Sequence, residues 1–230
     1  GPPMRWDDVR DALYPDTAEL EDFSYERVER FLRFVRGEQA SLFSGTVGIE
    51  EYSERVQPHS PGLAERIWYG AASTRSAEWA GAHGLNLLTS SVVRAESPEG
   101  PYDFAQIQLG HIEAYRAAHP DPQRARVSQG LVVIPTDSAT QQQRAKYEQY
   151  AATRLPRTRE PQGPARMLFA ADLVGTSEQI AEQLQQHAAY REVEEVAFAL
   201  PFSFAHEDYV QILTDIAGRL GPALGWSPSR

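Results

Sequence analysis

The chain has 230 residues, no cysteine and a formal net charge of −10. The lack of cysteine excludes disulfides, thiolate metal sites and a cysteine nucleophile, and it fits a cytoplasmic protein. The excess of negative charge argues against nucleic acid and anionic membranes as main partners. Hydrophobic residues make up 41% of the chain, enough for a sizeable core, and no apolar run is long enough to span a membrane.

The N-terminal quarter is polar, with one amphipathic segment. Asp22–Arg36 has apolar residues at helical spacing, Ser24 is a candidate N-cap, and Gly37 ends the predicted helix. Residues 38–65 are rich in glycine and proline, which predicts a long loop with one short strand at Ser44–Ile49.

The stretch from Arg66 to Ser91 predicts a strand, a tight turn, a helix and a second strand. Ile67–Tyr69 favours a strand, and Ser73 is a good N-cap for the helix that follows. Gly84 is placed to end that helix, and the apolar run Leu85–Leu88 is typical of a buried parallel strand.

The start of this helix is a candidate anion site. A strand that enters a helix through Gly70, Ala71, Ala72 and Ser73 leaves backbone N–H groups at the helix start, where a phosphate binds well. The same pattern also fits an ordinary βαβ unit with a well-capped helix and no ligand, so the residues alone leave both interpretations open.

Strands and helices alternate through the rest of the chain. Strands are predicted at 66–69, 85–90, 127–134 and 194–200. Further helices are predicted at Tyr102–His119, Ser138–Arg154, Thr176–Tyr190 and Glu207–Leu220. This alternation predicts four parallel strands that neighbour one another in chain order, with helices on the outer side and an open edge near Ile67.

Motifs with known chemistry are absent from the sequence. There is no glycine-rich nucleotide loop and no nucleophile elbow, and none of the six histidines is paired at ligand spacing, so no metal site is expected. Leu155–Ala165 holds three prolines and a glycine, which predicts a poorly ordered surface loop.

Two segments together resemble the bacterial-luciferase-like flavin monooxygenases. The first is IWYGAASTRSAEWAGAHGLNLLTSS at 67–91, and the second is LVGTSEQIAE at 173–182. The resemblance implies an α/β fold of the (β/α)8 TIM-barrel type. Because the family's N-terminal strands have no counterpart here, we expect one incomplete barrel domain over residues 1–230, covering about the C-terminal half to two-thirds of the barrel.

The resemblance also implies where a flavin would bind. Ser73 and Ser76 match positions that bind the flavin phosphate, and Ala72 replaces a residue that is acidic in the light-emitting relatives. The implied cofactor-binding residues are Gly70, Ala71, Ala72, Ser73, Arg75, Ser76, Thr89 and Ser90. Arg75 fits a surface position equally well, and 155–165 would be a mobile lid in which Arg157 and Arg159 meet the bound anion. The family's reactive histidines lie on strands that this sequence lacks, so no catalytic residue is assigned.

The implied activity is that of a flavin-dependent monooxygenase. It would use reduced FMN, supplied by a separate flavin reductase, and oxygen on a small organic substrate, and it would form a homodimer. Two alternatives remain: a deazaflavin-dependent oxidoreductase on the same fold, and a non-catalytic flavin-binding remnant.

Overall fold

The computed structural model describes residues 25–42 and 44–227, and these divide into two compact units at the boundary between Ala64 and Glu65. Within the described residues, no helix has the length and apolar character needed to cross a membrane. The expectation of a single barrel domain over 1–230 stays a prediction. The Ser24 cap falls outside the described residues.

The first unit contains one helix and one hairpin. Helix α2 covers Tyr25–Val35, with Leu32 buried, as its spacing predicts. The strand expected at 44–49 is shorter than predicted, because β1 (Gly45–Val47) turns at Gly48 and pairs antiparallel with β2 (Glu50–Tyr52). Gly48 has a φ of 67°, which suits a two-residue hairpin loop. The second strand was not predicted because β2 begins with two glutamates, which are uncommon in strands.

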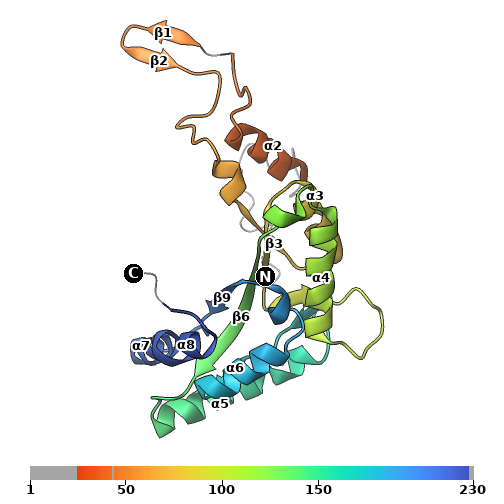
Figure 1. Ribbon diagram of the computed structural model, residues 1–230, viewed down its shortest axis with the longest axis vertical. Coiled ribbons are helices and arrows are strands. Elements are labelled where there is room, and N and C mark those ends of the chain that lie inside the picture. The colour runs from red at the N-terminus through yellow and green to blue at the C-terminus, as the bar shows by residue number, and fades with distance from the viewer. Residues whose placement is uncertain (1–24, 43, 228–230) are drawn as a thin grey trace. The chain divides into compact units, whose positions relative to one another are not determined.

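The second unit is built on one open, parallel sheet (Figure 1). Its strands are β3 (Trp68–Ala71), β4 (Asn86–Thr89), β6 (Val127–Pro135), β8 (Leu173–Gly175) and β9 (Glu195–Ala199). The four predicted strands are confirmed as parallel neighbours in the order β3-β4-β6-β9. Strand β3 ends this order, as expected for an edge near Ile67, and the described strands do not close a barrel.

The sheet forks at β6, which the sequence did not predict. Strand β9 pairs with Ser128–Val132, whereas β8 pairs with Val133–Pro135 at the far end of the same strand. A separate antiparallel pair joins β5 (Val92–Arg94) to β7 (Met167–Phe169). Strands β5, β7 and β8 have only three residues each, too few for a clear alternating pattern.

Helices cover both faces of the second half of β6. Leu131 and Val133 pack against α6 (Ser177–Gln186), whereas Val132 and Ile134 pack with side chains of α5 (Gln141–Arg154) and α7 (His206–Asp215). Alternate residues of a strand point to opposite faces, so the helices are not confined to one side, contrary to the prediction. Strand β6 is therefore buried on both faces here.

The remaining helices pack on the first strands. Helices α3 (Thr74–Ala82) and α4 (Phe104–Ala118) pack with β3 and β4 around one buried cluster. Ile112 and Tyr115 of α4 are fully buried, and the polar residues Gln108 and His111 on the same face are buried with them.

Helix ends follow local capping signals where these exist. Thr176 and Gln179 form a capping box at the start of α6. That helix ends at Gln186, four residues before the predicted end, and a 3-10 turn, η4 (Tyr190–Glu192), follows. Similarly, the helix predicted to run to Leu220 becomes a π-helical segment, η5 (Ile216–Leu220), before the short α8 (Gly221–Ala223).

Candidate functional site

The turn between β3 and α3 is the candidate site. Ser73 is the N-cap of α3, with extended backbone angles (φ −144°, ψ 157°), and its hydroxyl oxygen accepts a 3.2 Å hydrogen bond from the Ser76 N–H. The Ser73 and Ser76 hydroxyl oxygens lie 2.8 Å apart. The predicted cap is therefore confirmed, and the two hydroxyls lie side by side at the positive end of the helix.

Small residues leave this turn open. A Cβ atom placed on Gly70 would meet nothing within 4 Å, and Ala71 and Ala72 add only methyl groups. At its other end, α3 is capped by His83 and stops at Gly84, whose φ of 66° suits the left-handed C′ position. The local sequence thus accounts for both ends of α3 and for the space beside its start.

Thr89 and Ser90 lie at the same edge of the sheet as the turn, because Ala71 pairs in register with Thr89. Their side chains are already engaged within the protein. Thr89 is 1% exposed, and its hydroxyl accepts a 3.2 Å hydrogen bond from the Gln108 amide. The Ser90 hydroxyl donates to the Val92 carbonyl and accepts from the Val92 N–H. The hydroxyl groups of both residues are therefore used in contacts within the protein, and these contacts hold the edge of the sheet in place.

Glu96 is a residue of the site that the sequence analysis missed. Its carboxylate accepts hydrogen bonds from the Thr74 N–H, at 3.1 Å, and from the Thr74 hydroxyl, at 2.7 Å. An anionic group of this chain therefore lies at the first residue of α3. Glu96 is 22 residues from Thr74 in the sequence, and no local signal connects the two.

A buried polar chain runs behind this edge. The Gln108 amide donates to the Thr89 hydroxyl and to the Ser90 carbonyl, and its oxygen accepts from Gln129 at 2.5 Å. Gln129 also lies 3.5 Å from Nδ1 of His187. These contacts fix the end of β4 to α4 and to β6. Sequence reasoning did not find them because glutamines carry no motif.

Two histidines of this unit are shielded from water, His111 fully and His187 in part. His111 is 2% exposed, and its Nδ1 has no hydrogen-bond partner in the part of the chain that the structure describes. Burial lowers the pKa of His111, and the negative charge of Glu96 acts in the opposite direction. Burial also lowers the pKa of His187, against the opposing charge of Asp103. Both side chains are therefore favoured in their neutral form.

Comparison with known proteins identifies similar folds among solved structures and no similar sequence family. No protein-family model and no curated protein sequence matches the chain. Among solved structures, apo-MsnO8 aligns with a TM-score of 0.55 and 19% identity over 95% of this chain and 72% of its own. Long-chain alkane monooxygenase, LadA, aligns with a TM-score of 0.50 and 12% identity over 93% of this chain and 60% of its own.

The chain has the luciferase-like α/β fold. The fold class expected from the two sequence segments is thus confirmed. In a luciferase-like sheet of parallel strands, the Ser73–Ser76 turn and Thr89–Ser90 meet at the carboxyl edge, where α/β folds bind ligands. The assignment of these residues to a flavin phosphate stays a prediction.

The segment proposed as a lid in this luciferase-like fold contains regular structure. Residues Leu155–Thr158 form a 3-10 turn, η3, and Gln162 pairs with Met167. The Arg157 guanidinium lies 4.1 Å from the centre of the Phe169 ring, and burial lowers the pKa of Arg157, aided by the charge of Arg154. The contact with Phe169 therefore holds the Arg157 side chain within the second unit. The poor order expected of 155–165 stays a prediction.

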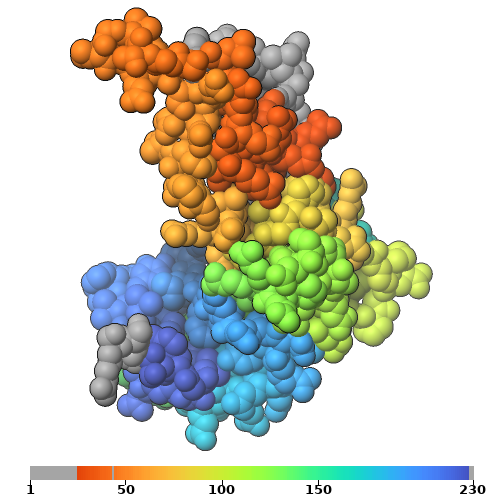
Figure 2. Space-filling model, turned by 45° about the horizontal axis from the view of Figure 1, so that its top comes forward, coloured from red at the N-terminus to blue at the C-terminus, as the bar shows by residue number. Residues whose placement is uncertain are grey.

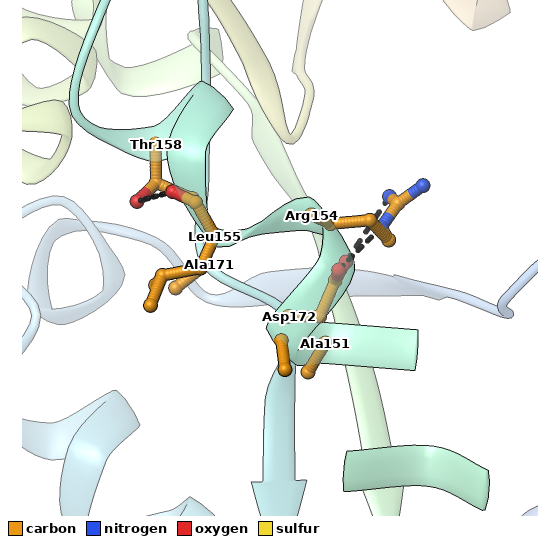
Figure 3. Close-up of a pocket in the computed structure, with 7 residues that line it drawn as sticks. Ala151, Arg154, Leu155, Thr158, Ala171 and Asp172 are labelled. Carbon is orange, nitrogen blue, oxygen red and sulfur yellow. Dashed lines mark hydrogen bonds and ion pairs between the residues drawn. The ribbon is translucent and has the colours of Figure 1, made fainter. Parts of the chain in front are cut away.

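A small cavity beside η3 is smaller than typical ligand pockets. It has a volume of about 170 Å³ and is lined by Ala151, Ala152, Arg154, Leu155, Thr158, Ala171 and Asp172. Figure 3 shows the Arg154 guanidinium joined to the Asp172 carboxylate beside it, with Nε 2.5 Å from Oδ2. This volume is below the roughly 300 Å³ of typical ligand pockets. Within residues 25–42 and 44–227, no group of three acidic, histidine or cysteine side chains is placed to hold a metal.

Proposed function

We propose that this chain is a luciferase-like flavin-dependent oxidoreductase that uses reduced FMN and oxygen on a small organic substrate. The observation that carries the proposal is the pair of adjacent hydroxyls, Ser73 and Ser76, at the start of α3 on the carboxyl edge of a luciferase-like sheet. The monooxygenase activity named for LadA supports the class of reaction, because LadA shares this fold. When bound, the flavin supplies the redox chemistry and the protein supplies its placement.

The residues present fit an oxyanion at this turn. The carboxylate of Glu96 already accepts hydrogen bonds from Thr74 at the helix start, so the geometry suits a group of that charge and shape. In the proposed complex, the Ser73 and Ser76 hydroxyls donate to the phosphate, and Gly70, Ala71 and Ala72 leave room for its approach. Arg75, an exposed residue of the first turn of α3, adds a positive charge nearby.

Thr89 and Ser90 have a positioning role in this proposal. Their hydroxyls are engaged with Gln108 and with Val92, so they hold the end of β4 in place. We assign no catalytic residue. A separate flavin reductase, a homodimer and a cytoplasmic location belong to the same proposal, as does FMN in preference to a deazaflavin coenzyme.

A non-catalytic flavin-binding protein is the second candidate. Its support is that the Ser73 and Ser76 hydroxyls suit a phosphate, whereas we assign no described residue to the reaction. Such a protein would bind FMN with the same residues and would show no turnover.

One set of measurements separates these possibilities. The purified chain is titrated with FMN, riboflavin and a deazaflavin coenzyme, and binding is followed by flavin fluorescence. Oxygen consumption is then measured with a flavin reductase and NADH, with and without the chain, over a panel of small organic substrates. Substrate-dependent turnover supports the enzyme, and FMN binding without turnover supports the second candidate. If no flavin binds, the proposed function is wrong.

A further inference from the structure

The carboxylate of Glu96 lies where an anionic ligand of α3 would lie. Its two oxygens accept from the N–H and from the hydroxyl of Thr74, at 3.1 and 2.7 Å, as the oxygens of a phosphate do at a helix start. Helix α3 has nine residues, and the partial positive charge at its N-terminus stabilises either kind of anion.

A buried histidine lies on α4, the helix that packs against α3 around a shared cluster. His111 is 2% exposed, and its Nδ1 has no hydrogen-bond partner among the described residues. Burial lowers the pKa of His111, and the negative charge of Glu96 acts in the opposite direction.

Glu96 is attached to a fixed backbone but carries an exposed side chain. The preceding residue, Ala95, is 1% exposed, and its N–H donates to the Arg166 carbonyl at 2.9 Å. Glu96 begins the exposed segment 96–101, which projects from the second unit in Figure 1 and in Figure 2. Rotation of the side chain alone would move the carboxylate into water without disturbing the core.

We propose that Glu96 is a specificity-determining residue of the candidate site, because its carboxylate competes with the phosphate of a ligand for the start of α3. This inference rests on the proposed function. A phosphorylated flavin binds only when the carboxylate has turned away, since two anions at one helix start repel each other. A flavin without a phosphate meets no such competition. Glu96 thus lowers the preference of the site for FMN over riboflavin.

The test compares Glu96→Gln with a matched control, Glu99→Gln. Glutamine keeps the size of Glu96 and removes its charge, and Glu99 is an exposed glutamate of the same segment. We expect Glu96→Gln to increase affinity for FMN at least about tenfold and affinity for riboflavin less than about twofold. Glu99→Gln should leave both unchanged, and Glu96→Ala should act in the same direction as Glu96→Gln.

A second readout does not depend on flavin binding. Inorganic phosphate is added to each protein, with sodium chloride of equal ionic strength as the control, and the melting temperature is measured. Phosphate should raise the melting temperature of Glu96→Gln more than that of the unchanged chain. Equal phosphate shifts and equal FMN affinities in the two proteins overturn the inference. If no flavin binds to any variant, the proposed function fails, and the phosphate shifts alone decide the role of Glu96.

Discussion

The hydroxyl oxygens of Ser73 and Ser76 lie 2.8 Å apart at the start of α3, within hydrogen-bond distance. In this arrangement one hydroxyl donates to the other, and both lie in the first turn of the helix. The pair also explains the backbone geometry, because the Ser73 oxygen accepts from the Ser76 N–H. A ligand phosphate would exchange the contact between the hydroxyls for contacts of its own.

Replacement of both serines by alanine should weaken FMN binding much more than riboflavin binding. A hydrogen bond to a charged group contributes about 1.5–3 kcal/mol, so we expect a loss of a few kcal/mol at most for FMN. Fluorescence titration with both ligands measures the difference. Loss of the Ser73 cap also costs about 1 kcal/mol of stability, which urea unfolding checks separately. Equal losses for FMN and riboflavin would show that the turn is only a helix cap.

Gly81→Ala should destabilise the second unit although alanine favours helices. A Cβ atom on Gly81 would lie 2.3 Å from the Tyr115 carbonyl oxygen and 3.2 Å from the Ala118 Cβ, so α3 and α4 would have to separate. Such overpacking costs about 1–3 kcal/mol, which exceeds the gain of about 1 kcal/mol in helix propensity.

Gly110→Ala is the matched control for this change. Gly110 also lies in a helix, α4, but a Cβ atom there would meet nothing within 4 Å. We expect this variant to gain up to about 1 kcal/mol in the free energy of unfolding, measured with urea. A stabilised Gly81→Ala protein would contradict the close approach of the two helices.

The ion pair of Arg154 and Asp172 should contribute to stability because it is largely buried. The side chain of Asp172 is 4% exposed and that of Arg154 is 20% exposed. Asp172→Asn leaves the guanidinium without its counter-charge, and we expect a loss of about 3 kcal/mol in the free energy of unfolding. In contrast, Glu65→Gln, which breaks an exposed pair with Arg124, should change it by less than about 1 kcal/mol. Similar values for the two variants would contradict this account.

Acid should destabilise the second unit through His111 and His187. Burial lowers the pKa of each, so the unfolded chain, with histidine pKa values near 6.5, binds more protons as the pH falls. The free energy of unfolding should be constant above about pH 7 and should fall below it, by at most about 1.4 kcal/mol per pH unit for each histidine.

Urea unfolding between about pH 7.5 and pH 5 measures this dependence. His111→Gln should flatten the curve, because one buried group no longer titrates. His206→Gln, a change at an exposed residue of α7, serves as the control and should leave the slope as it was. A slope that does not change in His111→Gln would show that this histidine is not held neutral by the fold.

Local features of this fold could be predicted because they depend on residues close together in the chain. The cap of α3 at Ser73 and the capping box of Thr176 and Gln179 each join residues three apart. The four main strands were identified from apolar runs, and their parallel order followed from the helices between them. The turn at Gly70–Ser76 was predicted for the same reason, because its residues are continuous in the sequence.

Only the tertiary structure decided which distant groups meet. Glu96 reaches Thr74, Gln129 contacts Gln108 and His187, and β6 is shared by β8 and β9. None of these contacts produces a periodic pattern in the sequence. A polar side chain is expected to face solvent unless the fold places a hydrogen-bond partner next to it. Buried polar groups need hydrogen-bond partners, and the start of a helix favours a nearby anion. Both effects act between distant residues only once the chain is compact.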